Sequence, residues 1–222
     1  MQRISNLQDL NKFNVNLEEF EQVKQTLYDS VTYPNAGANS LRFFQSPIGQ
    51  NGKTIEDTNL TLAGQLPTNQ LFLVECVELL FLPNFAYAND STDRIAEFGA
   101  QQAQEIVNDV YQFRKAGALT FRIGSKDYLE EAPLHKFPTK TKIDVCGSAL
   151  ADATTAGSDA QSRIAYAQGS GRPYFIDPPL LLIENQNFSV TLSWPNGSEA
   201  LPSGLDAKVF CIFDGKLFRR AQ

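Results

Sequence analysis

The sequence of 222 residues is poor in the residue types that most often carry catalysis and bind metal ions. It contains a single histidine, His135, which lies between two prolines in the stretch APLHKFP. A Ser-His-Asp or Cys-His site would have to use this residue, and no G-x-S-x-G motif accompanies it. H-E-x-x-H, C-x-x-C, P-loop and G-x-G-x-x-G motifs are also missing. We therefore interpret His135 as an exposed loop histidine, and the sequence predicts no enzymatic activity, metal site or cofactor.

Cysteine is scarce as well, with three residues in the whole chain. An odd number without paired spacing does not indicate a disulfide framework, and residues so far apart do not form a zinc-binding motif. Each of them lies in or beside a predicted strand. The sequence therefore predicts buried, reduced thiols at Cys76, Cys146 and Cys211.

Long apolar segments are missing too. Residues 1–14 contain no apolar core of a secretory signal. The longest apolar run, residues 71–83, is too short to span a bilayer and contains Glu75 and Glu78. These two glutamates are separated by an odd number of positions on one strand, so we expect them on opposite faces and not as a catalytic pair. The sequence predicts a soluble protein that is made in a cytoplasm.

Positive charge is in the minority, because 19 basic residues stand against 25 acidic ones and the net charge is −6. This balance argues against a protein that binds nucleic acid over its whole surface, and no motif suggests sequence-specific binding. Two local basic stretches, residues 135–142 and the terminal KLFRR, allow two interpretations. They are either solvated strand edges or a face turned toward a polyanion such as a packaged genome or lipid headgroups. The residues concerned are Lys136, Lys140, Lys142, Arg219 and Arg220.

Alternating apolar and polar residues are the clearest pattern that the sequence does contain. In FSVTLSWPNG, the residues Phe188, Val190, Leu192 and Trp194 share one face, and the run stops at Pro195-Asn196-Gly197. This pattern predicts a half-buried strand that ends in a turn, with Trp194 in the core.

Similar segments recur along the second half of the chain and predict an all-β domain of about eight to ten strands. The segment LFLVECVELLF is apolar on both faces, as expected of a central strand. Asp214-Gly215 is predicted to join the last two strands as a tight hairpin. The expected strands include ALTFRIG, DYLEEAPLHKFP, TKIDVCG, PLLLI, NFSVTLSW, AKVFCIF and KLFRR.

Two segments have helical periodicity. Residues 16–31 are predicted to form an N-terminal helix with an apolar stripe of Leu17, Phe20, Val23, Leu27 and Val31. Residues 92–115 are predicted to form an inserted helix that stops before Gly117. The apolar face of this second helix consists of Ile95, Phe98, Ile106, Val110 and Phe113.

Two further segments are candidates for contacts between subunits. Residues 147–172 are rich in Gly, Ala and Ser, and they predict a mobile loop that orders against neighbouring subunits through Ile164 and Tyr166. The N-terminal arm carries scattered apolar residues that are too few to form a core of their own. We expect it to order against a neighbour through Ile4, Leu7, Leu10 and Phe13.

Three stretches together resemble a known family. SLRFFQSPIGQNGKTIEDTNLTLAGQLPTNQLFLVECVELLFLP is similar to the early segment of jelly-roll coat proteins from tailless icosahedral bacteriophages. FRIGSKDYLEEAPLHKFP and DPPLLLIENQNFSVTLSWPNG are similar to the later strands of these proteins. The likeness covers roughly residues 33–222, and its motifs are structural.

The resemblance implies a single jelly-roll β-sandwich over residues 33–222, preceded by an arm and helix over residues 1–32. It also implies a structural protein of the virion, most simply the major capsid protein, that assembles with copies of itself. Other virion proteins, an internal membrane and the packaged genome are further candidate partners. The alternative is a carbohydrate-binding or receptor-binding jelly roll, such as a spike or vertex module.

Overall fold

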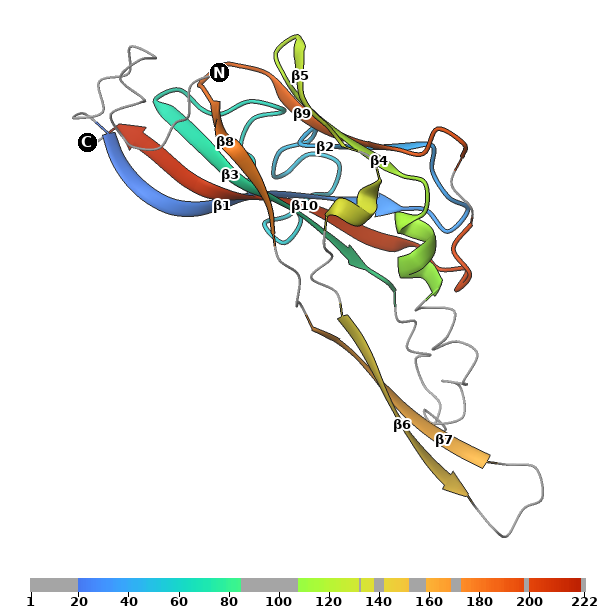
Figure 1. Cartoon of the computed structure of the whole chain (residues 1–222). Coiled ribbons are helices and arrows are strands. Elements are labelled where there is room, and N and C mark those ends of the chain that lie inside the picture. The colour runs from blue at the N-terminus through green and yellow to red at the C-terminus, as the bar shows by residue number, and fades with distance from the viewer. Residues whose placement is uncertain are drawn as a thin grey trace.

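The computed structural model describes the backbone and most side chains of residues 20–84, 108–131, 133–137, 142–151, 159–168, 173–197 and 200–220. For Glu131 and for residues 142–151 and 159–168 it describes the backbone alone. The body of the molecule consists of two four-stranded antiparallel sheets that face each other (Figure 1). No helix in this part of the chain is long and apolar enough to cross a membrane.

The first sheet, sheet A, has the strand order β1-β10-β3-β8. Its strands are β1 (Phe20–Tyr33), β10 (Ala207–Arg220), β3 (Gln70–Leu82) and β8 (Tyr174–Leu182). The second sheet, sheet B, has the order β2-β9-β4-β5. Its strands are β2 (Ser40–Phe43), β9 (Phe188–Ser193), β4 (Ala118–Ile123) and β5 (Lys126–Glu131). The predicted all-β sandwich is therefore confirmed.

The pairing of the strands is nested along the chain. β1 pairs with β10, β2 with β9, β3 with β8, and β4 with β5, all antiparallel. Two further pairings, β10 with β3 and β4 with β9, join these pairs into the two sheets. The first four strands of the sandwich thus pair in order with the last four, taken from the end of the chain inward, and the four pairs enclose a shared core.

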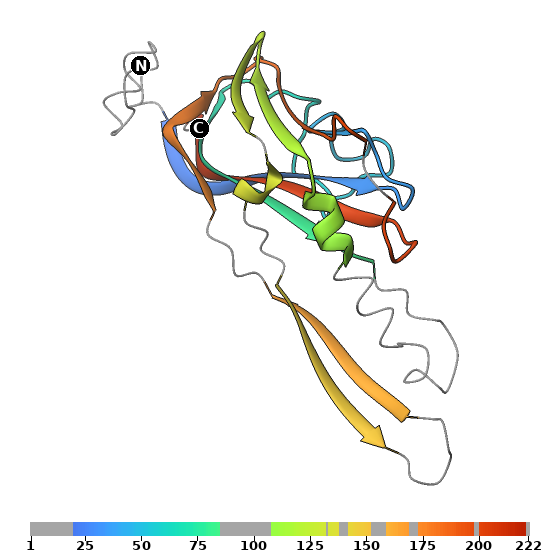
Figure 2. The same cartoon turned by 45° about the vertical axis from the view of Figure 1, so that its right-hand side comes forward.

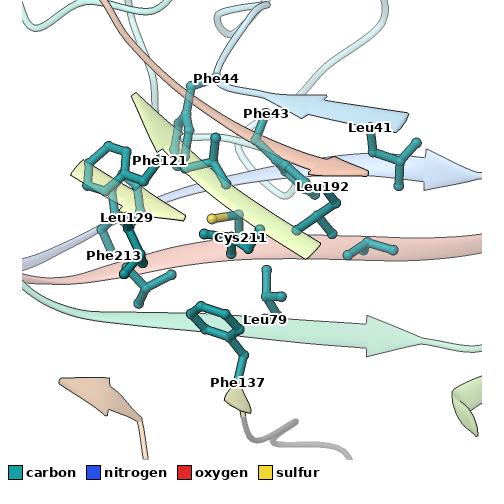
Figure 3. Packing of buried hydrophobic residues seen from close by; sticks show 14 of the residues in the cluster. Leu41, Phe43, Phe44, Leu79, Phe121, Leu129, Phe137, Leu192, Cys211 and Phe213 are labelled. Atoms are coloured by element: carbon teal, nitrogen blue, oxygen red, sulfur yellow. The ribbon is translucent and has the colours of Figure 1, made fainter. Parts of the chain in front are cut away.

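The core lies between the sheets and is rich in aromatic side chains. The rings of Phe44 and Phe121 lie 4.9 Å and 4.8 Å from the ring of Phe213, centroid to centroid, and Figure 3 shows these side chains converging from different segments. β9 alternates between buried and half-buried residues as predicted. Trp194 is buried, and its indole N–H donates a hydrogen bond to the carbonyl oxygen of Phe113 at 3.0 Å. The predicted core position of Trp194 is therefore confirmed.

The predicted N-terminal helix is wrong where the structure describes the chain, because Phe20–Tyr33 is strand β1. β1 pairs with β10 along its whole length, so the sandwich begins well before residue 33. Leu27 and Val31 fit a helical stripe, but they also share one face of a strand. Pairing with a distant segment decided between the two, as is common for sequences of mixed propensity. Residues 1–19, with Ile4, Leu7, Leu10 and Phe13, lie outside the described residues.

The predicted tight hairpin at Asp214-Gly215 is also wrong, because β10 continues through both residues. Its pairing with β1 is regular there, whereas its pairing with β3 shifts by one residue in a β-bulge. A Cβ atom added to Gly215 would lie 1.9 Å from the carbonyl oxygen of Leu73. Glycine is therefore needed for a close approach of two backbones and not for a turn.

The end of the predicted inserted helix is present, since residues 108–114 are helical, and the preceding residues 85–107 lie outside the described part of the chain. Phe113 of its predicted apolar face is buried and stacks on Phe81 with 4.7 Å between ring centroids. A Cβ on Gly117 would lie 2.5 Å from the side chain of Leu134. This glycine therefore lets the 3-10 helix η3 (Leu134–Lys136) pack closely.

The expected loop over residues 147–172 is wrong for the described residues 147–151 and 159–168, which are strands. β6 (Lys142–Ala151) and β7 (Asp159–Gln168) form a separate two-stranded antiparallel sheet, which extends away from the sandwich in both views (Figures 1 and 2). A composition of Gly, Ala and Ser hides the strand pattern, yet the two backbones satisfy each other's hydrogen bonds. In this register Lys142 lies opposite Gln168, Cys146 opposite Ile164, and Asp144 opposite Tyr166.

Candidate functional site

A buried ion pair attaches the connection between β2 and β3 to sheet A. Asp29 of β1 is fully buried, and its carboxylate accepts hydrogen bonds from Lys53 Nζ at 2.6 Å and from the backbone N–H of Phe44 at 2.6 Å. Burial raises the pKa of Asp29, while Lys53 and Phe44 act in the opposite direction. The pair joins β1 to the connection between β2 and β3, a contact that no local sequence pattern predicted.

A second, more exposed pair lies beside the first. The Asp57 carboxylate accepts hydrogen bonds from Lys208 Nζ at 2.5 Å, Ser30 Oγ at 3.1 Å and the Thr54 N–H at 3.0 Å. The hydrogen bond from Lys208 is the main reason why the pKa of Asp57 lies well below its ordinary value. Asp57 thus ties the connection to both β1 and β10.

The lowered pKa of Asp57 predicts a loss of stability in acid. Because the folded state holds this proton more weakly than the unfolded state, the stabilisation is complete above the ordinary pKa of 3.8 and is lost as pH falls below it. Asp57→Asn should therefore lower the free energy of unfolding at neutral pH, and its difference from the parent should shrink in acid. Urea unfolding at successive pH values measures both, with Glu56→Gln as a neighbouring control. An equal difference at every pH would contradict the role of Asp57.

The same connection covers part of the outer edge of β1. The Asn59 side chain accepts a hydrogen bond from the Tyr28 N–H at 3.0 Å and donates one to the Thr26 carbonyl at 2.7 Å. Thr58 Oγ1 donates to the Tyr28 carbonyl at 3.0 Å. The Asn59 side chain thus satisfies backbone groups of Thr26 and Tyr28 that would otherwise be open to pairing with a neighbouring strand. Sequence reasoning missed this role, because a contact between segments 31 residues apart leaves no local pattern.

Residues 20–25, which precede this cap, form the open part of the β1 edge. They pair with β10 on one side, and no hydrogen bond between described residues reaches their backbone on the other side. A groove of about 260 Å³ begins at Gln25, and its wall is mixed: apolar residues such as Leu27 and Leu217 alternate with polar ones such as Asn59, Gln70 and Arg219. Val23, whose side chain is 38% exposed, is on the same face of β1 as Gln25 and Leu27. We call residues 20–25 together with this groove the β1 edge site.

The outward face of sheet A is also apolar next to this site. Leu71, Leu73 and Phe218 form a small cluster, and Phe20 and Leu181 pack against it. These residues come from all four strands of sheet A. Further along the sheet, Phe175 of β8 has 60% of its surface exposed. This cluster is buried, whereas residues 21–25 at the start of β1 are exposed and polar except for Val23.

Of the predicted basic residues, those whose side chains the structure describes, Lys136, Arg219 and Arg220, do not form one patch. Lys136 lies in η3, whereas Arg219 and Arg220 lie at the end of β10 (Figure 1). Arg219 pairs with Glu21 at 3.2 Å, so its charge is partly compensated. Lys140 lies outside the described residues, and Lys142 is described by its backbone in β6 alone.

Two of the three predicted buried thiols are confirmed. Cys76 and Cys211 are buried and make no disulfide. Burial raises the pKa of Cys76 to about 11 and that of Cys211 well above its ordinary value, so both are protonated at neutral pH. Cys146 lies in β6, where the side chains are not described. His135 is exposed, as predicted, in η3.

The prediction that Glu75 and Glu78 lie on opposite faces is wrong. A bulge between Val74 and Cys76 interrupts the alternation of β3. Both carboxylates act on the Cys76 thiol, and Glu75 lies 3.5 Å from Lys216 on the outward face of sheet A. Among the described residues, no group of three or more His, Cys, Asp or Glu side chains has a geometry that could hold a metal ion.

A shallow polar depression of about 320 Å³ lies at the turn between β4 and β5. Its lining includes Gln45, Arg122, Asn187 and Ser189. The Arg122 guanidinium is held by two hydrogen bonds to the carboxylate of Asp127, at 2.6 Å and 2.8 Å. The depression therefore presents mostly neutral donors and acceptors.

Comparisons of the chain with protein-family models, with curated proteins and with solved structures find no match in any of the three.

Proposed function

We propose that this chain is a jelly-roll coat subunit that assembles with copies of itself into the shell of a tailless icosahedral bacteriophage. The observation that carries the proposal is the nested pairing of eight strands in two sheets, β1 with β10, β2 with β9, β3 with β8 and β4 with β5. A jelly roll consists of eight strands in two Greek keys, and this order of pairing is what such a roll requires.

Jelly rolls also occur in lectins, so the fold alone does not select a function. The resemblance of residues 40–83, 121–138 and 177–197 to phage coat proteins favours the shell. In this proposal the subunit belongs to the virion, and other virion proteins and an internal membrane or the genome are further partners.

The β6–β7 hairpin is proposed as a second contact between subunits. A two-stranded hairpin that projects on its own is marginally stable in water, and packing against a neighbour would stabilise it. Because Lys142 and Gln168 are opposite each other, residues 143–167 can be replaced by Asn-Gly without moving the ends of the hairpin. We expect this variant to keep the melting temperature of the sandwich and to form no particles. Normal particles from the variant would exclude the hairpin as a required contact.

Electron microscopy of the purified full-length protein tests the main proposal. Closed particles or regular oligomers of the shell are expected at high protein concentration. A protein that stays monomeric and binds immobilised glycans would favour the carbohydrate-binding alternative, for which the polar depression beside Arg122 is the candidate site. In that case Asn187→Ala should reduce glycan binding, because it removes a side-chain donor and acceptor from the lining.

A further inference from the structure

We propose that residues 13–18 of a second copy of this chain add to sheet A as an extra strand along the β1 edge site. This inference rests on the proposed function, since it names the surface through which two subunits meet. The occupant of the open edge of β1 is then an extended segment whose apolar side chains face the groove.

The open edge offers backbone groups that need a partner. An edge strand exposes a row of N–H and C=O groups, which can pair with an added strand. The other edges of the two sheets are less suited to this. β8 contains Pro178 and Pro179, which have no N–H to donate, and β2 is only four residues long. β5 is dominated by charged side chains, which discourage pairing at an edge. Residues 20–25 of β1 are thus the most accessible edge in the described part of the chain.

The groove beside this edge offers partly apolar walls to the side chains of an added strand. Strand addition gains affinity from backbone hydrogen bonds and specificity from pockets that take alternate side chains. Val23, Gln25 and Leu27 share the face of β1 that borders the groove. An added strand whose apolar residues alternate would place one of them beside Val23, on the face of β1 that borders the groove. The occupant should therefore alternate apolar and polar residues over about six positions.

The sequence that precedes β1 has this pattern. Residues 13–18 read Phe-Asn-Val-Asn-Leu-Glu, a strict alternation with Phe13, Val15 and Leu17 on one side. Six residues match the length of the open edge, residues 20–25. The polar side carries two asparagines and one glutamate. In the proposed pairing it would face outward, as Lys24 of β1 does.

The same sequence indicates that the segment comes from another copy. No glycine or proline occurs between residue 1 and Tyr33, whereas a tight return onto β1 would require a turn immediately before Phe20. The residues in that place, Asn16 to Glu19, include Leu17 and two glutamates and lack the glycine that short hairpin loops prefer. The segment is therefore suited to run on past its own subunit and to reach the edge of a neighbour.

Hydrogen exchange of the full-length protein, measured as a function of its concentration, tests this inference. Added backbone hydrogen bonds should slow the exchange of residues 20–25 by about tenfold or more when subunits associate. Val15→Pro removes a donor and disrupts an added strand, so it should abolish this protection and weaken association in sedimentation. Asn6→Pro, in the same arm but outside the segment, is the matched control and should behave like the parent.

A second variant addresses the other side of the contact. Val23→Lys places a charge on the groove face of β1 at a partly exposed position, so the sandwich should keep its melting temperature while association weakens. Protection that does not depend on concentration would assign the segment to its own subunit and overturn the inference. Unprotected residues 20–25 in associated protein would overturn it as well.

The outcome is separable from that of the proposed function. Normal particles from Val15→Pro, with residues 20–25 unprotected, would refute the strand addition and leave the coat function standing. Concentration-dependent protection in a protein that forms dimers and never particles would refute the coat function and leave the strand addition standing.

Discussion

Replacing Gly215 with alanine is expected to destabilise the sandwich by roughly 3–5 kcal/mol, or to prevent folding. The added Cβ would lie 1.9 Å from the carbonyl oxygen of Leu73 and 3.3 Å from the backbone nitrogen of Glu75. These are backbone atoms of the neighbouring strand β3, so no side chain can move aside to make room. The bulge would have to open, and the pairing of β10 with β3 would be lost around it. Urea unfolding of parent and variant measures the loss.

Gly52→Ala is the matched control for this substitution. Gly52 has a positive φ of 72°, but a Cβ there would meet no atom within 4 Å. Alanine at this position should cost about 1–2 kcal/mol, because only the backbone conformation is unfavourable. If Gly215→Ala were no more destabilising than Gly52→Ala, β10 would tolerate a side chain at the bulge and the close approach would not be required.

Replacing Lys53 with methionine is expected to destabilise the protein by roughly 3–5 kcal/mol at neutral pH, because it leaves the buried carboxylate of Asp29 without its counter-ion. The comparison is Lys208→Met, which breaks the more exposed pair with Asp57. Lys208 is 45% exposed in its side chain, and breaking that pair should cost about 1 kcal/mol or less. Unfolding in urea at neutral pH compares the two variants directly.

The loss in Lys53→Met should depend on pH in a defined direction. Burial raises the pKa of Asp29 above 3.8, and removing Lys53 raises it further. The folded state then binds this proton more tightly than the unfolded state. The destabilisation should consequently be small below the ordinary pKa of 3.8 and should grow as pH rises through the folded-state pKa. The double variant Asp29→Asn/Lys53→Met should remove most of this dependence, and a loss that stayed constant with pH would contradict the buried charge.

Much of the secondary structure was predictable from local patterns. The alternation in residues 188–194 depends on which face of one strand is buried, and the structure places Phe188, Val190, Leu192 and Trp194 in the core as expected. The all-β class, the buried thiols of Cys76 and Cys211 and the helical end at residues 108–114 were also predictable. These properties follow from the order of residues along a few turns or strands, because burial imposes a period on the sequence.

The remaining features depend on partners that are distant in the sequence. Residues 20–33 fit a helix in isolation and form a strand because β10, at the other end of the chain, pairs with them. The local sequence around Gly215 predicts a turn, whereas in the structure this glycine lets β10 approach the backbone of Leu73 closely. The hairpin of β6 and β7 forms in a segment whose composition is typical of a loop. The contacts of Asp29 with Lys53 and of Asn59 with β1 likewise join separate segments. The sequence specified which residues prefer to be buried or extended, and tertiary pairing decided which backbone and charged groups they meet, because those energies exist only once the two segments are side by side.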